Sequence, residues 1–234
     1  MQRSTERRRQ RWLRQYSEAL LSRDVRDIAN LEKLELLPRL LQALALMAGQ
    51  LTNLNQLAGQ LGLDHKTAAR YLGVLEQLFL VRRLHPWRIN PLARLVKTPK
   101  LQFLDSGLLA SLLGIDSATV QRDRTRFGAL LESYVVAELF KLAGWSDGEA
   151  QLFSWRDKDQ REVDVVIESR AGAVVGVEMK AKASLQPADL RGLKRFAGQA
   201  GDRFLAGLLL YDGLETLPLG PGLWAVPLAT LWEL

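Results

Sequence analysis

The sequence contains no cysteine, and histidine occurs only twice in 234 residues, as His65 and His85. Without cysteine, disulfide bonds and thiolate metal sites are excluded. A zinc site or histidine-based acid–base chemistry would need nearly all of the available imidazoles. We therefore expect neither histidine to act as a metal ligand or as a catalytic acid or base.

Long apolar runs are also lacking, because no segment reaches the roughly 18 consecutive apolar residues of a membrane-spanning helix. The Arg-rich N-terminus has no apolar run behind it, which is unlike a secretory signal peptide. We expect a cytoplasmic protein with no membrane contact. The hydrophobic content of 47% and the charged content of 25% are typical of a globular protein with a sizeable core.

Positive charge is concentrated in the first part of the chain, whose overall net charge is +6. Residues 1–100 contain 18 Lys and Arg against 8 Asp and Glu, whereas residues 101–234 contain 14 against 18. A basic segment joined to an acidic one indicates a module that binds a polyanion, linked to a second part. A solvated basic helix would give the same bias, so both interpretations stay open.

The first hundred residues have the periodicity of helices followed by one strand. Helices are predicted over residues 5–30, 31–49, 53–61 and 65–78, and a strand over 79–84. Helix, tight turn, helix and strand is the order of a winged helix-turn-helix, in which the second helix enters the DNA groove. The candidate nucleic-acid-binding residues are His65, Lys66, Arg70, Arg82 and Arg83.

An alternative to DNA contact is open for this element. Winged helices also act as protein–protein or interdomain modules, and Lys66 and Arg70 are spaced as on an ordinary solvated helix face. Residues 85–104 contain three prolines, which predicts a connector with little regular structure. A short strand over 101–104 and a small helix over 107–114 follow.

The remaining residues predict an αβββαβ unit. The expected helices cover residues 127–143 and 187–200, and the expected strands cover 152–155, 162–168, 174–180, 204–211 and 224–226. We expect an α/β (α+β) protein with a helical, winged-helix-like domain at residues 1–100 and a second domain at 101–234.

Acidic residues interrupt the apolar strands of this unit. Asp164 lies within Val-Asp-Val-Val-Ile, and Glu178 and Lys180 alternate on one face of the next strand. Pairing of the two strands would bring Asp164 beside Glu178. Adjacent carboxylates repel unless a cation neutralises them, and hard oxygen ligands suit Mg²⁺ or Mn²⁺. A nearby ammonium group would orient the attacking water or stabilise charge on a phosphate.

Glu132 is the third candidate acid, on the helix before the strands. Its helical neighbours Ala129 and Val136 are apolar, so its carboxylate needs a partner such as a metal ion or Lys180. We expect Glu132, Asp164, Glu178 and Lys180 to be catalytic, and the three acids to bind the metal. Each has an ordinary alternative: backbone bonds for Asp164, a salt bridge between Glu178 and Lys180, and pairing with Arg126 for Glu132.

At these residues the sequence resembles the PD-(D/E)xK nuclease superfamily, with Glu178-Met179-Lys180 as the E-x-K element. More specifically it resembles the DUF4143 region found C-terminal to AAA+ ATPase domains in bacteria and archaea. The matching stretches are residues 16–27, 54–80, 94–109, 128–139 and 153–180. The resemblance implies a restriction-endonuclease-like fold for the second domain. The chain contains no G-x-x-x-x-G-K-[ST] element, so we do not expect it to act as an ATPase by itself.

Two functions are expected from these features. The first is a Mg²⁺- or Mn²⁺-dependent nuclease, a hydrolase in which the winged helix holds DNA and the second domain cuts it. The second is a non-catalytic nucleic-acid-binding module that regulates a separate ATPase. Self-association is a third, weaker alternative, based on the apolar strand Leu205–Tyr211 and on Trp224 and Trp232 near the C-terminus.

Overall fold

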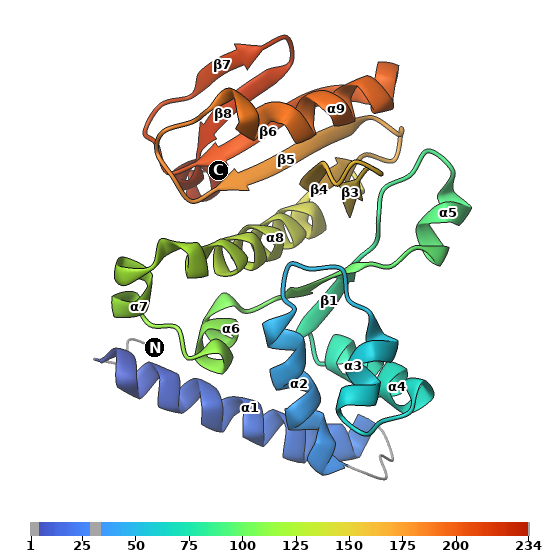
Figure 1. The fold of residues 1–234 in the computed structure, drawn as a ribbon, viewed down its shortest axis with the longest axis vertical. Coiled ribbons are helices and arrows are strands. Elements are labelled where there is room, and N and C mark those ends of the chain that lie inside the picture. The colour runs from blue at the N-terminus through green and yellow to red at the C-terminus, as the bar shows by residue number, and fades with distance from the viewer. Residues whose placement is uncertain (1–4, 29–33, 234) are drawn as a thin grey trace. The chain divides into compact units, whose positions relative to one another are not determined.

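The computed structural model describes residues 5–28 and 34–233 (Figure 1). The chain packs as two units that interleave along the sequence. Unit 1 comprises residues 1–83 and 101–134, and unit 2 comprises residues 84–100 and 135–234. Both helices and strands are present, which confirms the expected α/β class. The domain boundary at residue 100 stays a prediction, since a packing unit and a domain are not defined in the same way.

Unit 1 is mainly helical. Its elements are α1 (Glu6–Ile28), α2 (Leu37–Leu46), α3 (Leu54–Gln60), α4 (His65–Gln77), β1 (Val81–Leu84), β2 (Lys100–Phe103), α6 (Ser106–Leu113), α7 (Ser117–Arg122) and the start of α8 (Gly128–Trp145). Residues 29–33, which the sequence also predicts as helical, lie outside the described residues. The core of this unit is largely leucine from α2 and α4, with Tyr71 fully buried among them.

Side-chain caps set the helix boundaries in unit 1. The Asn53 side chain accepts a hydrogen bond from the Gln56 amide at the start of α3, and Asp64 does the same for Thr67 at the start of α4. Gly62 makes the turn between them with a φ of +67°. The strands β1 and β2 pair after α4 and form a two-stranded sheet.

Unit 2 is built on a six-stranded mixed sheet with the order β3-β4-β5-β6-β8-β7. The strands are β3 (Gln151–Arg156), β4 (Glu162–Glu168), β5 (Val174–Lys180), β6 (Phe204–Tyr211), β7 (Leu217–Gly220) and β8 (Leu223–Pro227). The pairs β5–β6 and β6–β8 are parallel, and the others are antiparallel. Helix α9 (Arg191–Ala200) lies across β4, β5 and β6, as Figure 1 also shows for β5 and β6.

The core of unit 2 is aromatic as well as aliphatic. Trp87, Trp155 and Phe196 are fully buried, and Phe196 on α9 meets both tryptophan rings edge to face. Gly176 on β5 allows α9 to approach, because a Cβ at this position would lie 3.0 Å from the Leu193 side chain. Burial of this face holds α9 against the strands that carry the acidic residues.

The connector after β1 is the main departure from the sequence prediction. It contains helix α5 (Pro91–Val96), and Pro86 pairs in parallel with Ser154 of β3. The Trp87 amide donates to the Ser154 carbonyl at 2.6 Å, and the Ser154 amide donates to the His85 carbonyl at 2.9 Å. The expectation of little regular structure was therefore wrong. Pro91 is compatible with this helix, because it occupies the first turn of α5, where no amide donor is needed.

Within the described residues, no helix combines the length and the apolar character that crossing a membrane requires. The cytoplasmic location expected from the sequence stays a prediction.

Candidate functional site

Antiparallel pairing of β4 with β5 brings two acids together. Val165 pairs with Val177, so the alternation of side chains puts Asp164 and Glu178 on one face of the sheet. Only 8% of Asp164 and 6% of Glu178 is exposed. Asp164 Oδ2 accepts a hydrogen bond of 2.9 Å from the Met179 amide, as the backbone-bond alternative anticipated.

Glu178 lacks a full set of partners. Its Oε1 accepts a hydrogen bond of 2.8 Å from Lys180 Nζ, which is the same-face pair that the sequence allowed. Its Oε2 is buried and has no hydrogen-bond partner among the described residues. Burial, together with the nearby Asp164 carboxylate, raises the pKa of Glu178 to about 8.

The pKa of Lys180 is also raised, although burial acts on this group in the opposite direction. Burial by itself lowers the pKa of Lys180, but the Glu178 and Asp164 carboxylates raise it overall. The ammonium group is therefore charged at neutral pH. Its Nζ lies 2.8 Å from Glu178 Oε1.

A second lysine, Lys100, was missed by the sequence analysis. It is 3% exposed, and its Nζ lies 3.7 Å from Asp164 Oδ1 and 3.8 Å from Glu162 Oε2. Lys100 is the first residue of β2 and is separated by more than sixty residues from both acids. Nothing in its local sequence distinguishes it from a surface lysine, so only the fold reveals the contact.

Glu132 belongs to unit 1, unlike the other three candidates. Its carboxylate accepts a hydrogen bond of 2.7 Å from Gln102 Nε2, and the side-chain Oε1 of Gln102 accepts one of 3.0 Å from Ser133 Oγ. Gly49 leaves room for it, because a Cβ there would lie 2.9 Å from Glu132 Oε2. A role for Glu132 beside the acids of unit 2 stays a prediction.

The acid pair fits a small hard cation in part. Among residues 5–28 and 34–233, three or more Asp, Glu or His side chains do not gather in a group that could hold a metal ion. Two adjacent carboxylates and the unpartnered Glu178 Oε2 nevertheless offer the kind of ligands that Mg²⁺ uses, since Mg²⁺ keeps several waters and binds one or two carboxylates. Asp164 and Glu178 are the residues that would hold it.

The predicted nucleic-acid-binding residues are all exposed. His65, Lys66 and Arg70 lie on α4, and Arg82 and Arg83 lie on β1. Arg83 is committed to Glu76, with Nη2 2.6 Å from Oε2 and Nε 3.0 Å from Oε1. It is therefore less available to a phosphate than the three residues on α4.

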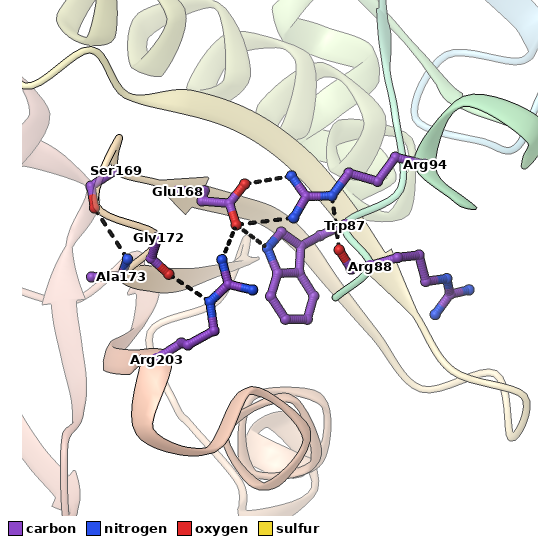
Figure 2. Close-up of polar contacts among 8 residues, drawn as sticks. All are labelled: Trp87, Arg88, Arg94, Glu168, Ser169, Gly172, Ala173 and Arg203. Atoms are coloured by element: carbon purple, nitrogen blue, oxygen red, sulfur yellow. Dashed lines mark hydrogen bonds and ion pairs between the residues drawn. The ribbon is translucent and has the colours of Figure 1, made fainter. Parts of the chain in front are cut away.

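A second buried acid, Glu168, lies at the other end of β4 (Figure 2). It accepts hydrogen bonds from Trp87 Nε1 at 3.1 Å, from Arg94 Nη2 at 3.0 Å and from Arg203 Nη2 at 2.8 Å. Arg94 Nη1 also contacts its second oxygen, so this pair is bidentate. Burial alone would raise the pKa of Glu168, but these hydrogen bonds and both arginine charges lower it below its ordinary value.

Sequence comparison finds longer proteins that resemble this chain. The uncharacterized proteins Rv2008c of Mycobacterium tuberculosis and Mb2031c of Mycobacterium bovis are each 31% identical to it over 217 residues. The match covers 92% of this chain and 47% of each relative, so the chain spans about half the length of these relatives. None of the solved structures matches this chain.

Two family models match the chain, each described as a domain of unknown function. Residues 1–119 match DUF8612, and residues 127–231 match DUF4143. The second match confirms the DUF4143 resemblance over the unit that contains the acid pair. Because the first model covers half of the sequence, the chain belongs to the DUF8612 family, and it joins that domain to a DUF4143 region.

Proposed function

We propose that this chain is a Mg²⁺-dependent nuclease of the PD-(D/E)xK type that acts on DNA. The observation that carries the proposal is the buried carboxylate pair of Asp164 and Glu178 with Lys180 at hydrogen-bond distance from Glu178. Two buried acids of this kind are costly unless a cation or a reaction uses them. The strand order and the α9 helix in front of the sheet support the restriction-endonuclease-like fold.

Each residue of this site would have a separate role in phosphodiester hydrolysis. A bound Mg²⁺ would supply Lewis acidity toward the scissile phosphate. Asp164 and Glu178 would hold the cation, and the Met179 amide fixes the orientation of the Asp164 carboxylate. Lys180 would orient the attacking water and stabilise the negative charge that develops on the phosphate.

DNA would be held by unit 1 in this proposal. Helices α2, α3 and α4 followed by the paired strands β1 and β2 support a winged helix-turn-helix. His65, Lys66 and Arg70 on the exposed side of α4 are the proposed groove and phosphate contacts, and the exposed Arg82 on β1 is a further candidate. The segment that follows β1 packs into unit 2 through Trp87, so it would not serve as a free wing.

Cleavage of DNA by active-site variants tests this function. Wild type, Asp164→Ala and Glu178→Ala would be incubated with supercoiled plasmid in Mg²⁺ or Mn²⁺. We expect each variant to lose at least about a thousandfold in cleavage rate while its far-UV circular dichroism is unchanged. Asp147→Ala, which changes another exposed acid of unit 2, is the matched control and should cut like wild type. Wild-type cleavage by either variant would contradict the proposal.

The second candidate function is a non-catalytic nucleic-acid-binding module that regulates a separate ATPase. The observation that favours it is Lys100, whose buried ammonium lies near Asp164 and offers an internal cation in place of a metal ion. This alternative predicts DNA binding with a steep salt dependence and no product in Mg²⁺ or Mn²⁺. Replacing Lys66 and Arg70 by glutamine should then weaken binding and reduce the salt slope, whereas Arg83→Gln should have less effect.

A further inference from the structure

A pocket of about 350 Å³ opens beside Glu168 and is lined by more positive than negative side chains. Three arginines, Arg94, Arg170 and Arg203, face two glutamates, Glu149 and Glu168. Every lining residue belongs to unit 2. Pockets of this volume are at the lower end of the range that holds small molecules in proteins.

The charges in this pocket do not cancel. Glu168 is one carboxylate between two guanidinium groups, Arg94 and Arg203, and these three leave one positive charge in excess. The pair of Arg170 with Glu149 is exposed, with side chains 78% and 64% accessible, so it is weak and easily exchanged. A partly buried excess of positive charge is relieved by binding an anion.

Hydrogen-bond donors are also left over. Arg94 donates from Nε to the Arg88 carbonyl and from both Nη atoms to Glu168, while Arg203 donates to the Gly172 carbonyl and to Glu168. A guanidinium carries more N–H groups than these bonds use, so donors of both arginines remain. Ser169 Oγ accepts from the Ala173 amide, which leaves its hydroxyl proton for a ligand (Figure 2).

The two inner arginines are held in place before any ligand binds. Arg94 Cζ lies 4.6 Å from the centre of the Phe153 ring, and Arg203 Cζ lies 5.6 Å from the Trp87 ring. Gly172 has a φ of +84°, and a Cβ on it would lie 2.8 Å from Arg203 Nη2. The turn therefore keeps a glycine where Arg203 passes, and the fixed donors lower the entropic cost of binding.

This pocket is separate from the Asp164 and Glu178 pair. Asp164 and Glu168 are four residues apart on β4, which is about 13 Å along a strand. Val166 lies between them on the same face and is fully buried in the core of unit 2. A ligand on this face cannot extend from one site to the other without displacing core side chains.

We propose that the pocket binds the terminal phosphate of a nucleotide-sized phosphomonoester. A phosphomonoester carries close to two negative charges at neutral pH and three acceptor oxygens, which suits several guanidinium donors and a hydroxyl. Its source is either a free nucleotide or the phosphorylated end of a nucleic acid strand. This inference does not depend on the nuclease proposal.

Calorimetric titration of the full chain tests the pocket. The probes are adenosine 5′-monophosphate, a 5′-phosphorylated oligonucleotide, the same oligonucleotide without its phosphate, and inorganic phosphate as a competitor. We expect saturable binding that requires the terminal phosphate and is displaced by inorganic phosphate. Binding of the monophosphate would identify a free nucleotide as the ligand, and binding of the phosphorylated oligonucleotide alone would identify a strand end.

Matched arginine variants locate the binding site. Arg170→Gln and Arg203→Gln should each raise the Kd about tenfold, the effect of losing one charged hydrogen bond. Arg191→Gln removes an exposed arginine of α9 outside the pocket and should bind like wild type. If Arg203→Gln does not fold, the exposed Arg170 variant decides. Absence of phosphate-dependent binding at millimolar concentrations, or wild-type affinity in Arg170→Gln, would overturn the proposal.

Discussion

The two ends of β4 carry buried acids with opposite electrostatic surroundings. Glu168 and Asp164 are each 8% exposed, and Glu178 beside Asp164 is 6% exposed. The pKa of Glu168 is lowered, because arginines and Trp87 donate to it despite its burial. The pKa of Glu178 is raised to about 8, because this side chain is buried next to the Asp164 carboxylate.

The difference separates a structural acid from a candidate functional one. Glu168 holds Arg94 and Trp87, two residues of the connector, against the sheet, so its charge serves the fold. Among the described residues, Glu178 Oε2 of the other pair is buried without a hydrogen-bond partner, so burial of this carboxylate destabilises the fold. Such a cost persists at sites that bind a cation or perform chemistry. Burial alone therefore does not identify a site; the balance of partners does.

Removal of the Glu168 carboxylate should have the largest effect on stability. Glu168→Ala leaves Arg94 and Arg203 without their shared anion, and we expect the free energy of unfolding to fall by about 3–5 kcal/mol. Glu149→Ala breaks only an exposed pair and should cost less than about 1 kcal/mol. Urea unfolding of both variants measures the difference. Equal losses would show that Glu168 has no special structural role.

Glu178 should make the folded protein less stable as the pH rises, whereas Glu168, with its lowered pKa, should make it more stable. A pKa of Glu178 raised from 4.5 to about 8 means that the folded protein binds a proton more tightly than the unfolded chain. The stabilisation is complete below about pH 4.5 and is lost as the pH rises through about 8. In EDTA, wild type should lose at least about 1.4 kcal/mol relative to Glu178→Gln over this range, the equivalent of one pKa unit.

Thermal unfolding of the two proteins between pH 5 and pH 9 measures this effect. Glu178→Gln keeps an oxygen for Lys180 and lacks the titrating group, so its stability should be flatter with pH. A wild-type protein that becomes more stable relative to this variant as the pH rises would contradict the assigned direction.

A glycine beside the Glu168 cluster should give the smallest effect. Gly172→Ala places a Cβ 2.8 Å from Arg203 Nη2 at a φ of +84°, and we expect a loss of about 1–2 kcal/mol in the free energy of unfolding. Gly198→Ala in α9 is the control, because among the described residues an added Cβ would meet nothing within 4 Å beyond its chain neighbours and its own helix backbone. It should be neutral or stabilise by about 0.5–1 kcal/mol. A neutral Gly172 variant would mean that the turn does not constrain Arg203.

The sequence predicted the central strands well. The expected strands at 162–168, 174–180 and 204–211 agree with β4, β5 and β6. Short runs of Val, Ile and Leu between turn residues favour buried β-strands. The small edge strand β7 was missed, since Pro218 and Gly220 interrupt its pattern. An edge strand tolerates proline because one side of it needs no ladder bonds.

The partners of the buried acids were harder to predict. The adjacency of Asp164 and Glu178 followed from strand alternation, which is local information. Glu168 was missed, because an acid at a strand end is more often exposed, and its partners Arg94 and Arg203 lie far away in the sequence. Lys100 was missed because its partners, Glu162 and Asp164, also lie far away in the sequence. The contacts of Trp87 and Arg94 with Glu168 depend on how the connector packs. Its prolines had led us to expect little regular structure there.

We propose that Asp164 and Glu178 form a cation site. Titration of Mg²⁺ or Mn²⁺ into the wild-type protein by calorimetry, with Glu178→Ala beside it, measures cation binding at this pair. We predict a saturable isotherm for wild type that vanishes in the variant. No heat and no thermal shift for either protein, with or without a DNA substrate, would contradict the claim and favour the metal-free binding module.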